Sequence, residues 1–305
     1  MSLESYVTGL MKEPAPKGMD RLVLSGLSQL EKMYFSQVEK KRTEDMAAAV
    51  SAHVPVISVG NITAGGTGKT PCILMLAELF FSIGKKPAII SRGYKSGLEK
   101  EGGCVSDGSS ILVSQQMAGD EPYMMARKLP SVPIFVGKDR IASVKRAEEM
   151  GVGILLLDDG FQYWKLRRDQ DIILIDATNP FGYGHGLPRG LLREPLDALS
   201  RASFFILTKS DQVHLTDQME IREELARLAP GVPVLSSTHA PSRVVPYEKW
   251  KAFLHEGTLE DVRMKKAYLV SGIGNPAAFR KTAKEAGLRP VGEMPFPDHH
   301  LSLIH

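Results

Sequence analysis

Short apolar runs rich in β-branched residues alternate with longer segments of helical period along most of the chain. The runs predict strands at 54–59, 87–90, 133–136, 154–157, 172–175, 204–207 and 232–235. Between them, apolar positions with helical spacing predict helices at 71–81, 121–127, 140–150 and 217–228. Because the strand segments are apolar throughout, both of their faces are expected to be covered. The pattern therefore predicts a doubly wound α/β domain with a mostly parallel sheet.

A second, smaller α/β domain is predicted towards the C-terminus. Residues 238–245 have the proline and polar content of a linker. Beyond them, 266–270 is typical of a strand, a glycine turn follows, and 276–286 has a helical pattern. We therefore expect an N-terminal helix and the main domain in residues 1–240 and the smaller domain in 241–305.

Two segments, 92–119 and 179–202, are too long to be simple connections. Each follows a predicted strand. We expect both to project from the carboxyl edge of the sheet, where open α/β sheets bind ligands.

A helical pattern also covers the N-terminal region. Apolar side chains recur at helical spacing from 22 to 38, and the basic cluster Lys40, Lys41 and Arg42 follows. Two interpretations stay open: the helix packs on its own domain, or it lies on the inner membrane surface, where each basic residue adds roughly 1 kcal/mol. The apolar runs are far shorter than the about 20 residues of a transmembrane helix.

The composition is that of an ordinary globular protein, with 43% hydrophobic and 24% charged residues. With 38 basic and 35 acidic residues the net charge is only +3, so we expect no nucleic-acid partner. The two cysteines, Cys72 and Cys104, have neither CxxC spacing nor companions, which disfavours a disulfide framework or a zinc site. The first twenty residues lack the apolar stretch of a signal peptide, so a cytoplasmic location is expected.

The strongest candidate for chemistry is the sequence GNITAGGTGKT at 60–70, which follows a predicted strand and precedes a predicted helix. This is the context of a P-loop, whose backbone N–H groups bind nucleotide phosphates. Lys69 is expected to reach the β- and γ-phosphates and Thr70 to bind Mg²⁺, although Thr63 replaces the first glycine of the motif. The predicted nucleotide-binding residues are Gly65, Gly66, Thr67, Gly68, Lys69 and Thr70.

Acidic residues supply the next candidates. Asp158 and Asp159 follow the predicted strand 154–157, where P-loop enzymes hold magnesium, although a turn or capping role is the alternative. Asp120 opens a predicted helix and is equally suited to capping it. The DHH sequence at 298–300 is either a metal-binding fragment or a surface segment.

Seven motifs occur in the order found in tetraacyldisaccharide 4'-kinases. They are GNITAGGTGKTP, SRGY at 91–94, GDEP at 119–122, VGKDR at 136–140, LDDGFQ at 157–162, LPRGLLREP at 187–195 and FPDHH at 296–300. The chain therefore resembles this family of lipid A enzymes from about residue 54 to residue 300.

The resemblance implies two α/β/α domains with the active site in the cleft between them, and ATP with Mg²⁺ as cofactors. It implies transfer of the γ-phosphate to the 4'-hydroxyl of a tetraacylated glucosamine disaccharide 1-phosphate, which gives lipid IVA. It also implies an N-terminal helix on the cytoplasmic face of the inner membrane, in a peripheral or monotopic manner. No obligate protein partner is expected.

The resemblance further implies roles for individual residues. Asp120 of GDEP corresponds to the candidate general base, assisted by His299 of the DH motif, and Lys69 completes the catalytic set. A histidine that orients a carboxylate or shares its proton suits this chemistry.

The same resemblance assigns metal and phosphate contacts. Asp158, Asp159 and Glu194 match the family's metal and phosphate region, together with Thr70. Arg140 and Arg193 lie at positions suited to balancing phosphate charge. The chain ends six residues after His299, where family members usually continue, so we expect an incomplete second domain.

Two other function classes remain open. Thr208-Lys209-Ser210-Asp211 resembles the guanine-reading NKxD of regulatory P-loop GTPases and metallochaperones, but Leu157 stands where their DxxG motif needs an aspartate. A preference for GTP over ATP would favour that class. A non-enzymatic membrane scaffold with a nucleotide site is the third possibility, and the test is turnover.

Overall fold

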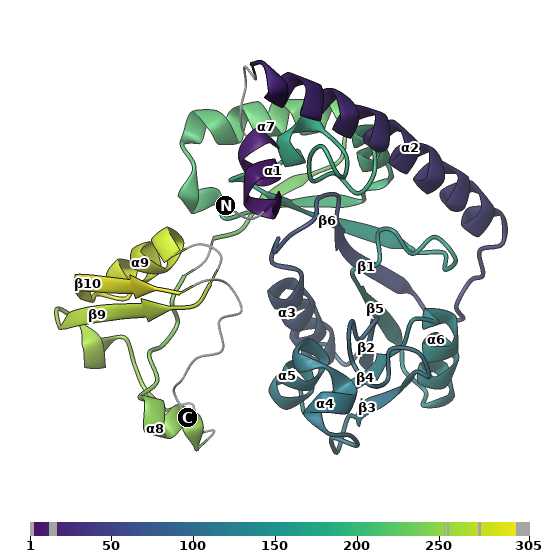
Figure 1. Cartoon of the computed structure of the whole chain (residues 1–305). Helices are drawn as coiled ribbons and strands as arrows, with labels where there is room; N and C mark the ends of the chain where they lie inside the picture. The colour runs from purple at the N-terminus through teal and green to yellow at the C-terminus, as the bar shows by residue number, and fades with distance from the viewer. Residues whose placement is uncertain are drawn as a thin grey trace. The chain divides into compact units, whose positions relative to one another are not determined.

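Eight of the described strands form one sheet in the larger of two units, Met1–Ser237 (Figure 1). The computed structural model describes residues 3–11, 17–238, 240–252, 254, 256–273 and 276–296. The strand order is β3-β4-β2-β5-β1-β6-β7-β8, and every neighbouring pair is parallel except β3 with β4. The strands are β1 (Val56–Asn61), β2 (Pro87–Ser91), β3 (Gly103–Asp107), β4 (Pro133–Val136), β5 (Ile154–Asp158), β6 (Gln170–Asp176), β7 (Phe204–Thr208) and β8 (Val234–Ser236).

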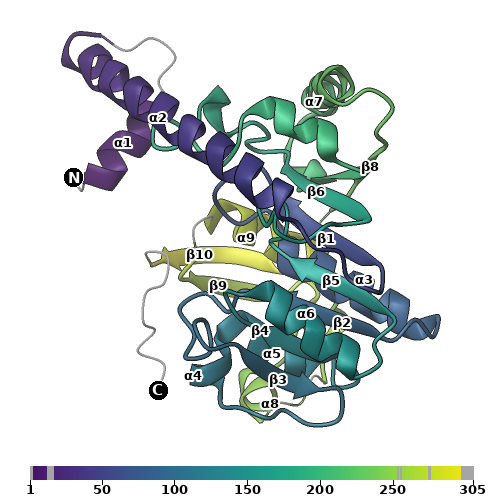
Figure 2. The same ribbon diagram turned by 90° about the vertical axis from the view of Figure 1, so that its right-hand side faces the viewer.

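Helices cover both faces of this sheet, as the apolar runs predict. Figures 1 and 2 show α3 and α5 on one face and α6 on the other. Ile89 and Leu156 pack into the cluster that contains α3 and α5, whereas their neighbours Ile90 and Leu157 pack with α6. The helices are α3 (Lys69–Ser82), α4 (Gln115–Ala118), α5 (Asp120–Lys128), α6 (Arg140–Glu149) and α7 (Leu215–Leu228). The prediction of a doubly wound, mostly parallel α/β fold is confirmed.

The antiparallel edge strand β3 is not among the predicted strands, because it lies inside the segment 92–119 that we expect to project from the sheet. Its sequence GCVSD has too few apolar residues to stand out, and an edge strand is covered by neighbours on fewer sides. Short 3-10 helices at Gly182–Gly184, Leu196–Arg201 and Ser210–Gln212 were also not predicted.

The N-terminal segment forms α1 (Leu3–Met11) and α2 (Met19–Ala47), and α2 is longer than the predicted 22–38. It is one continuous helix in Figures 1 and 2. None of the described helices combines the length and apolar composition that crossing a bilayer requires.

The second unit comprises Thr238–His305, so the division lies close to the predicted boundary at residue 240. It contains α8 (Tyr247–Lys251), a 3-10 helix at Glu260–Val262, β9 (Lys266–Ser271), α9 (Pro276–Glu285) and β10 (Arg289–Pro295). Strands β9 and β10 pair in parallel, and α9 contributes the buried Ala283. Strand β10 was not predicted because Pro290 and Gly292 interrupt its apolar pattern.

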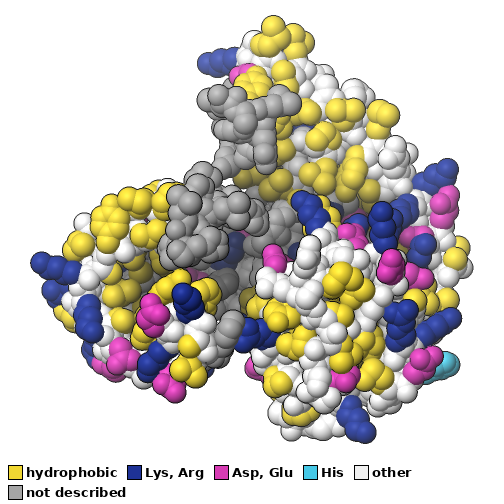
Figure 3. Space-filling view, turned by 60° about the horizontal axis from the view of Figure 1, so that its bottom comes forward, with side chains coloured by type: hydrophobic (Ala, Val, Ile, Leu, Met, Phe, Trp, Pro, Cys, Tyr) yellow, Lys and Arg dark blue, Asp and Glu magenta, His cyan; other side chains and the backbone are white. Residues whose placement is uncertain are grey.

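The face shown in Figure 3 is mixed in charge. Basic and acidic side chains are interspersed there among apolar ones, as the net charge of only +3 suggests.

Because the central strands are buried on both faces, a substitution that leaves a cavity in them should strongly lower the stability of the fold. Leu156→Ala, at a side chain with 0% exposure, is expected to lower the free energy of unfolding by about 2–5 kcal/mol. Leu235→Ala, at an edge-strand side chain with 55% exposure, is the control and should change it by about 0.5 kcal/mol or less. Denaturant unfolding measures both, and equal effects would contradict this description of the core.

Candidate functional site

The glycine-rich loop connects β1 to α3, as the sequence predicts. Strand β1 ends at Asn61 and α3 begins at Lys69. Gly68 caps α3 with a φ of 92°, a left-handed conformation that glycine adopts without strain. The N–H groups of the first helical turn have no partner within the helix, and they carry its positive dipole end. The loop and helix together form a site for an anion.

Lys69 is held at this loop by one hydrogen bond and one ion pair. Its Nζ donates to Asn61 Oδ1 at 3.1 Å and lies 3.7 Å from Asp159 Oδ1. Asn61 is buried, and its Nδ2 donates to the Thr63 carbonyl at 2.5 Å. Sequence reasoning missed Asn61, although its place just before the loop in GNIT marked it as a polar residue at the end of a buried strand.

Asp159 also forms a bidentate ion pair with Arg193. Arg193 Nη1 donates to Oδ1 at 2.7 Å and Arg193 Nη2 donates to Oδ2 at 3.1 Å. Burial raises the pKa of Asp159, but Arg193, Lys69 and Arg140 outweigh burial and hold the pKa below its ordinary value. The carboxylate is therefore ionised and joins the two cations.

Asp158 and Arg140 are buried beside Asp159. Asp158 accepts a hydrogen bond from Ser91 Oγ at 2.9 Å, and burial raises its pKa although Ser91 and Arg140 oppose the shift. Arg140 Nη1 donates to the Asp159 carbonyl at 3.0 Å, and its guanidinium lies 5.1 Å from the centre of the Tyr163 ring. Burial lowers the pKa of Arg140, and the two aspartates oppose this shift. No helix begins at the aspartate pair, so neither residue is a helix cap, whereas Asp159 does lie in the turn after β5, with a φ of 49°.

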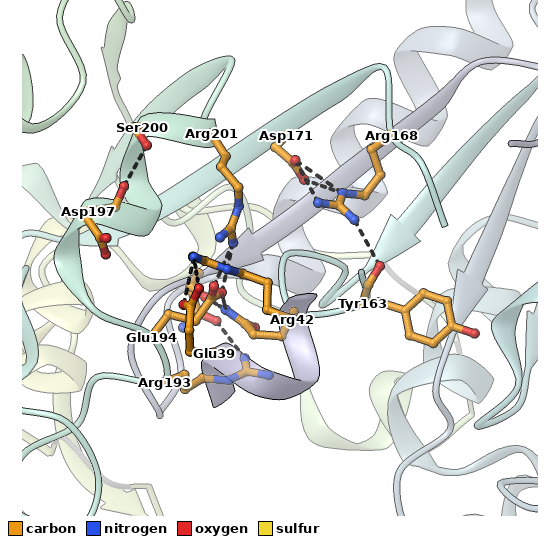
Figure 4. Close-up of polar contacts among 12 residues, drawn as sticks. Glu39, Arg42, Tyr163, Arg168, Asp171, Arg193, Glu194, Asp197, Ser200 and Arg201 are labelled. Carbon is orange, nitrogen blue, oxygen red and sulfur yellow. Dashed lines mark hydrogen bonds and ion pairs between the residues drawn. The ribbon is translucent and has the colours of Figure 1, made fainter. Parts of the chain in front are cut away.

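Glu194 lies in a different setting from the one expected of a metal ligand. Its side chain has 0% exposure, and both carboxylate oxygens accept hydrogen bonds from Arg201 Nη2, at 3.0 and 2.8 Å (Figure 4). Gln162 Nε2 donates to the same carboxylate at 2.9 Å. Arg201 in turn lies over the Phe161 ring, 4.3 Å from its centre. The structure therefore uses Glu194 to anchor its segment inside the domain.

The segment 182–194 runs beside the start of the P-loop. The Arg193 N–H donates to the Ile62 carbonyl at 2.8 Å, and the Ala64 N–H donates to the Leu191 carbonyl at 2.7 Å. These two backbone hydrogen bonds fix the position of the Arg193 Cα atom relative to the P-loop.

Helix α2 docks on the same segment. Glu31 Oε1 accepts a hydrogen bond from the Gly186 N–H at 2.6 Å, and Tyr34 Oη donates to the Arg193 carbonyl at 3.0 Å. A Cβ atom at Gly186 would lie 2.2 Å from the Phe35 ring, so a larger residue there requires this ring to move. Of the two interpretations of this helix, packing on its own domain is confirmed for this side of α2.

A cavity of about 550 Å³ opens beside these groups. Its lining includes six basic side chains and three aspartates, so positive charge dominates. The residues that line it come from the basic end of α2, from the carboxyl ends of β2 and β5, and from the start of α6. The cavity therefore lies at the edge where open α/β sheets bind ligands. The charged lining residues are Lys41, Arg92, Lys138, Arg140, Lys165, Arg193, Asp45, Asp139 and Asp159.

The predicted general base has a partly defined position. Asp120 is the first residue of α5, is exposed, and accepts a hydrogen bond from Gln115 Nε2 at 2.8 Å. The cap of α5 is Gly119, with no side-chain cap bond, so the capping interpretation of Asp120 is not supported. His299 and the rest of the 298–300 sequence lie outside the described residues, so the pairing of Asp120 with His299 stays a prediction.

The oxygen groups at the loop and at the end of β5 are of the chemical type that binds a magnesium ion arriving with a nucleotide. Such an ion keeps several waters and takes one or two protein oxygens. Thr70 on α3 and Asp158 at the end of β5 supply oxygens of this kind, whereas Asp159 and Glu194 are engaged by arginines. Within the described ranges, no group of three or more His, Cys, Asp or Glu side chains is arranged to hold a metal by itself.

A family model, related sequences and a solved structure all point to the same group of enzymes. A family model described as Tetraacyldisaccharide-1-P 4'-kinase, LpxK, matches residues 21–301. Tetraacyldisaccharide 4'-kinases of Halothermothrix orenii and Syntrophus aciditrophicus are 38% and 36% identical, over 98% of this chain and 80% and 82% of theirs. The crystal structure of LpxK from Aquifex aeolicus in complex with ATP superposes with a TM-score of 0.69 at 30% identity, over 91% of this chain and 83% of that one.

The setting of Glu194 predicts an effect on stability. Glu194→Gln leaves the Arg201 charge inside the domain without its anion, so the free energy of unfolding of metal-free protein is expected to fall by about 3 kcal/mol. Glu224→Gln, in the exposed pair with Arg227, is the control and should cost about 1 kcal/mol or less. If Glu194 acts only as a metal ligand, metal-free protein will unfold like wild type and only the Mg²⁺ dependence of activity will change.

Proposed function

This chain belongs to the tetraacyldisaccharide-1-P 4'-kinase (LpxK) family of lipid A biosynthesis, and we propose that its site moves the γ-phosphate of ATP to the 4'-hydroxyl of a tetraacylated glucosamine disaccharide 1-phosphate, forming lipid IVA. The observation that carries this proposal is the convergence of Lys69, Asp159 and Arg193 at the P-loop, beside a cation-lined cavity. The family match favours this activity over the regulatory GTPase and the scaffold.

The nucleotide half of the reaction belongs to the P-loop. Phosphoryl transfer needs positioning and charge stabilisation more than covalent chemistry. Lys69 binds the β- and γ-phosphates, and residues Gly65 to Thr70 supply N–H groups. When bound, Mg²⁺ at Thr70 and Asp158 would neutralise part of the phosphate charge.

Arg193 and Arg140 balance the charge that develops on the transferred group. The Asp159 carboxylate holds the guanidinium of Arg193, and the Asp159 backbone carbonyl holds the guanidinium of Arg140. Donors that are already in place need no reorganisation during the reaction, which is the main source of electrostatic catalysis. Glu194 acts as a positioning residue, because it anchors the segment that carries Arg193.

The cavity is the proposed place for the sugar-phosphate part of the acceptor. Its excess of Lys and Arg suits an anionic saccharide, and Arg193 is shared between the cavity lining and the contact with Asp159. Asp120 is the proposed base for the 4'-hydroxyl proton, with His299 as its helper.

The surface of α2 that faces away from the domain supports a position on the cytoplasmic face of the inner membrane. Met19, Leu22, Leu30 and Met33 are 72%, 68%, 50% and 60% exposed. With about 100° between successive helical residues, these four form one stripe opposite the docked side chain of Glu31. One face of α2 thus packs on the domain while the other is apolar, so the two interpretations of this helix are compatible.

Loss of Lys69 or Asp120 tests the assigned chemistry. Lys69→Ala and Asp120→Ala are each expected to lower the rate of phosphate transfer from ATP to the acylated disaccharide by about 10²-fold or more. Lys85→Ala, an exposed lysine just after α3, is the control and should retain the wild-type rate. A near-normal rate in either variant would contradict its role, and absence of turnover in wild-type protein would support the scaffold instead.

The apolar stripe of α2 is tested by lipid binding. Leu22→Glu with Leu30→Glu should release the protein from sedimenting vesicles that contain anionic phospholipid, because two charges replace apolar contact area. Leu215→Glu, at an equally exposed leucine of α7, should leave sedimentation unchanged. Unchanged sedimentation of the double variant would restrict α2 to packing on its own domain.

A further inference from the structure

The sequence Thr208-Lys209-Ser210-Asp211 resembles a base-reading motif but has no part in the function proposed above. It begins at the last residue of β7, two strands away from β1 in the sheet. Two of its side chains reach the backbone of the P-loop. This contact is independent of the cavity and of the Asp159 cluster.

Thr208 contacts the carbonyl of Thr67. Its hydroxyl is 3.1 Å from the Thr67 carbonyl oxygen and 3.3 Å from that of Ile175, and the side chain is buried. Because Thr208 is the residue paired with Asp176 across β6 and β7, the position of its hydroxyl is set by the sheet.

Lys209 contacts the preceding carbonyl of the loop. Its Nζ donates to the Gly66 carbonyl at 3.2 Å and to the Asp176 carboxylate. The ammonium group is thus held between the end of β6 and the P-loop. Neighbouring residues at the end of β7 therefore donate to consecutive carbonyls of the P-loop.

The direction of these carbonyls determines the direction of the adjacent N–H groups. A peptide unit is planar and trans, so its C=O and N–H bonds point in opposite directions. Donation to the carbonyls of Gly66 and Thr67 turns the N–H groups of Thr67 and Gly68 away from the β7 turn. It also keeps the negative ends of these dipoles away from the side of the loop where phosphates bind.

A glycine-rich loop has many accessible conformations, so contacts must hold it in one of them. We propose that Thr208 and Lys209 are positioning residues that hold the Gly66 and Thr67 carbonyls and so keep the P-loop N–H groups directed at the phosphates of ATP. This inference rests on the proposed use of the loop for ATP. In this role, residues 208–211 support phosphate binding and need not recognise the nucleotide base.

The test is direct ATP binding by calorimetry, together with the KM for ATP and for the acceptor. Thr208→Val and Lys209→Met are each expected to weaken ATP binding by about tenfold, the effect of losing one hydrogen bond. Thr208→Ser keeps the hydroxyl and should bind ATP within about twofold of wild type. The KM for the acceptor should not change.

Ser210→Ala is the matched control, because Ser210 lies in the same turn but its hydroxyl donates to the Ser237 carbonyl and not to the P-loop. It should bind ATP like wild type. Wild-type ATP affinity in folded Thr208→Val and Lys209→Met would overturn the proposal, as would an equal loss in Ser210→Ala. If Thr208→Val does not fold, Lys209→Met decides, since its side chain is partly exposed.

ATP binding needs no acceptor, so this experiment separates the two proposals. Protein that binds ATP as described but does not phosphorylate the disaccharide would refute the proposed function and leave the positioning role intact.

Discussion

Asp159 accepts two hydrogen bonds from the Arg193 guanidinium and lies 3.7 Å from Lys69 Nζ, so one carboxylate joins three segments that are far apart in the sequence. Without that anion, the two cations would repel each other across a partly buried space. With it, the lysine of the P-loop and the arginine of the neighbouring segment stay at fixed places before any phosphate arrives. Two further contacts keep this carboxylate and its partners in position: Asn61 accepts a hydrogen bond from Lys69, and Arg140 donates one to the Asp159 carbonyl.

Most of the sheet could be predicted from the sequence because its central strands are buried on both faces. Continuous apolar runs such as 154–157 have few alternatives to a buried strand when turn residues bound them. The P-loop was equally predictable, since its chemistry is local: strand, glycine-rich turn and helix are contiguous. The same holds for Asp158 and Asp159, whose place at the end of β5 follows from that strand.

The less predictable parts depend on individual side-chain contacts that no periodic pattern records. The ion pair of Glu194 with Arg201 and the hydrogen bond from Tyr34 to Arg193 leave no local pattern, because their partners come from different elements or from a short 3-10 helix. A buried glutamate and a metal-binding glutamate look alike in sequence, and only burial and partners separate them. Edge strand β3 and the proline-containing β10 were missed for a different reason, since neither has the apolar run of a strand covered on both faces.

Helix α2 carries the apolar residue Met33 on its outer face and the cavity residue Lys41 further along. These positions belong to one unbroken helix, so their axial separation is fixed at about 12 Å by a rise of about 1.5 Å per residue. If the apolar stripe of α2 rests on lipid as proposed, the helix axis runs along the bilayer surface. The separation of about 12 Å then sets a lateral distance between the lipid contact and the cavity, so the charged groups would stay beside the surface that holds an acylated acceptor.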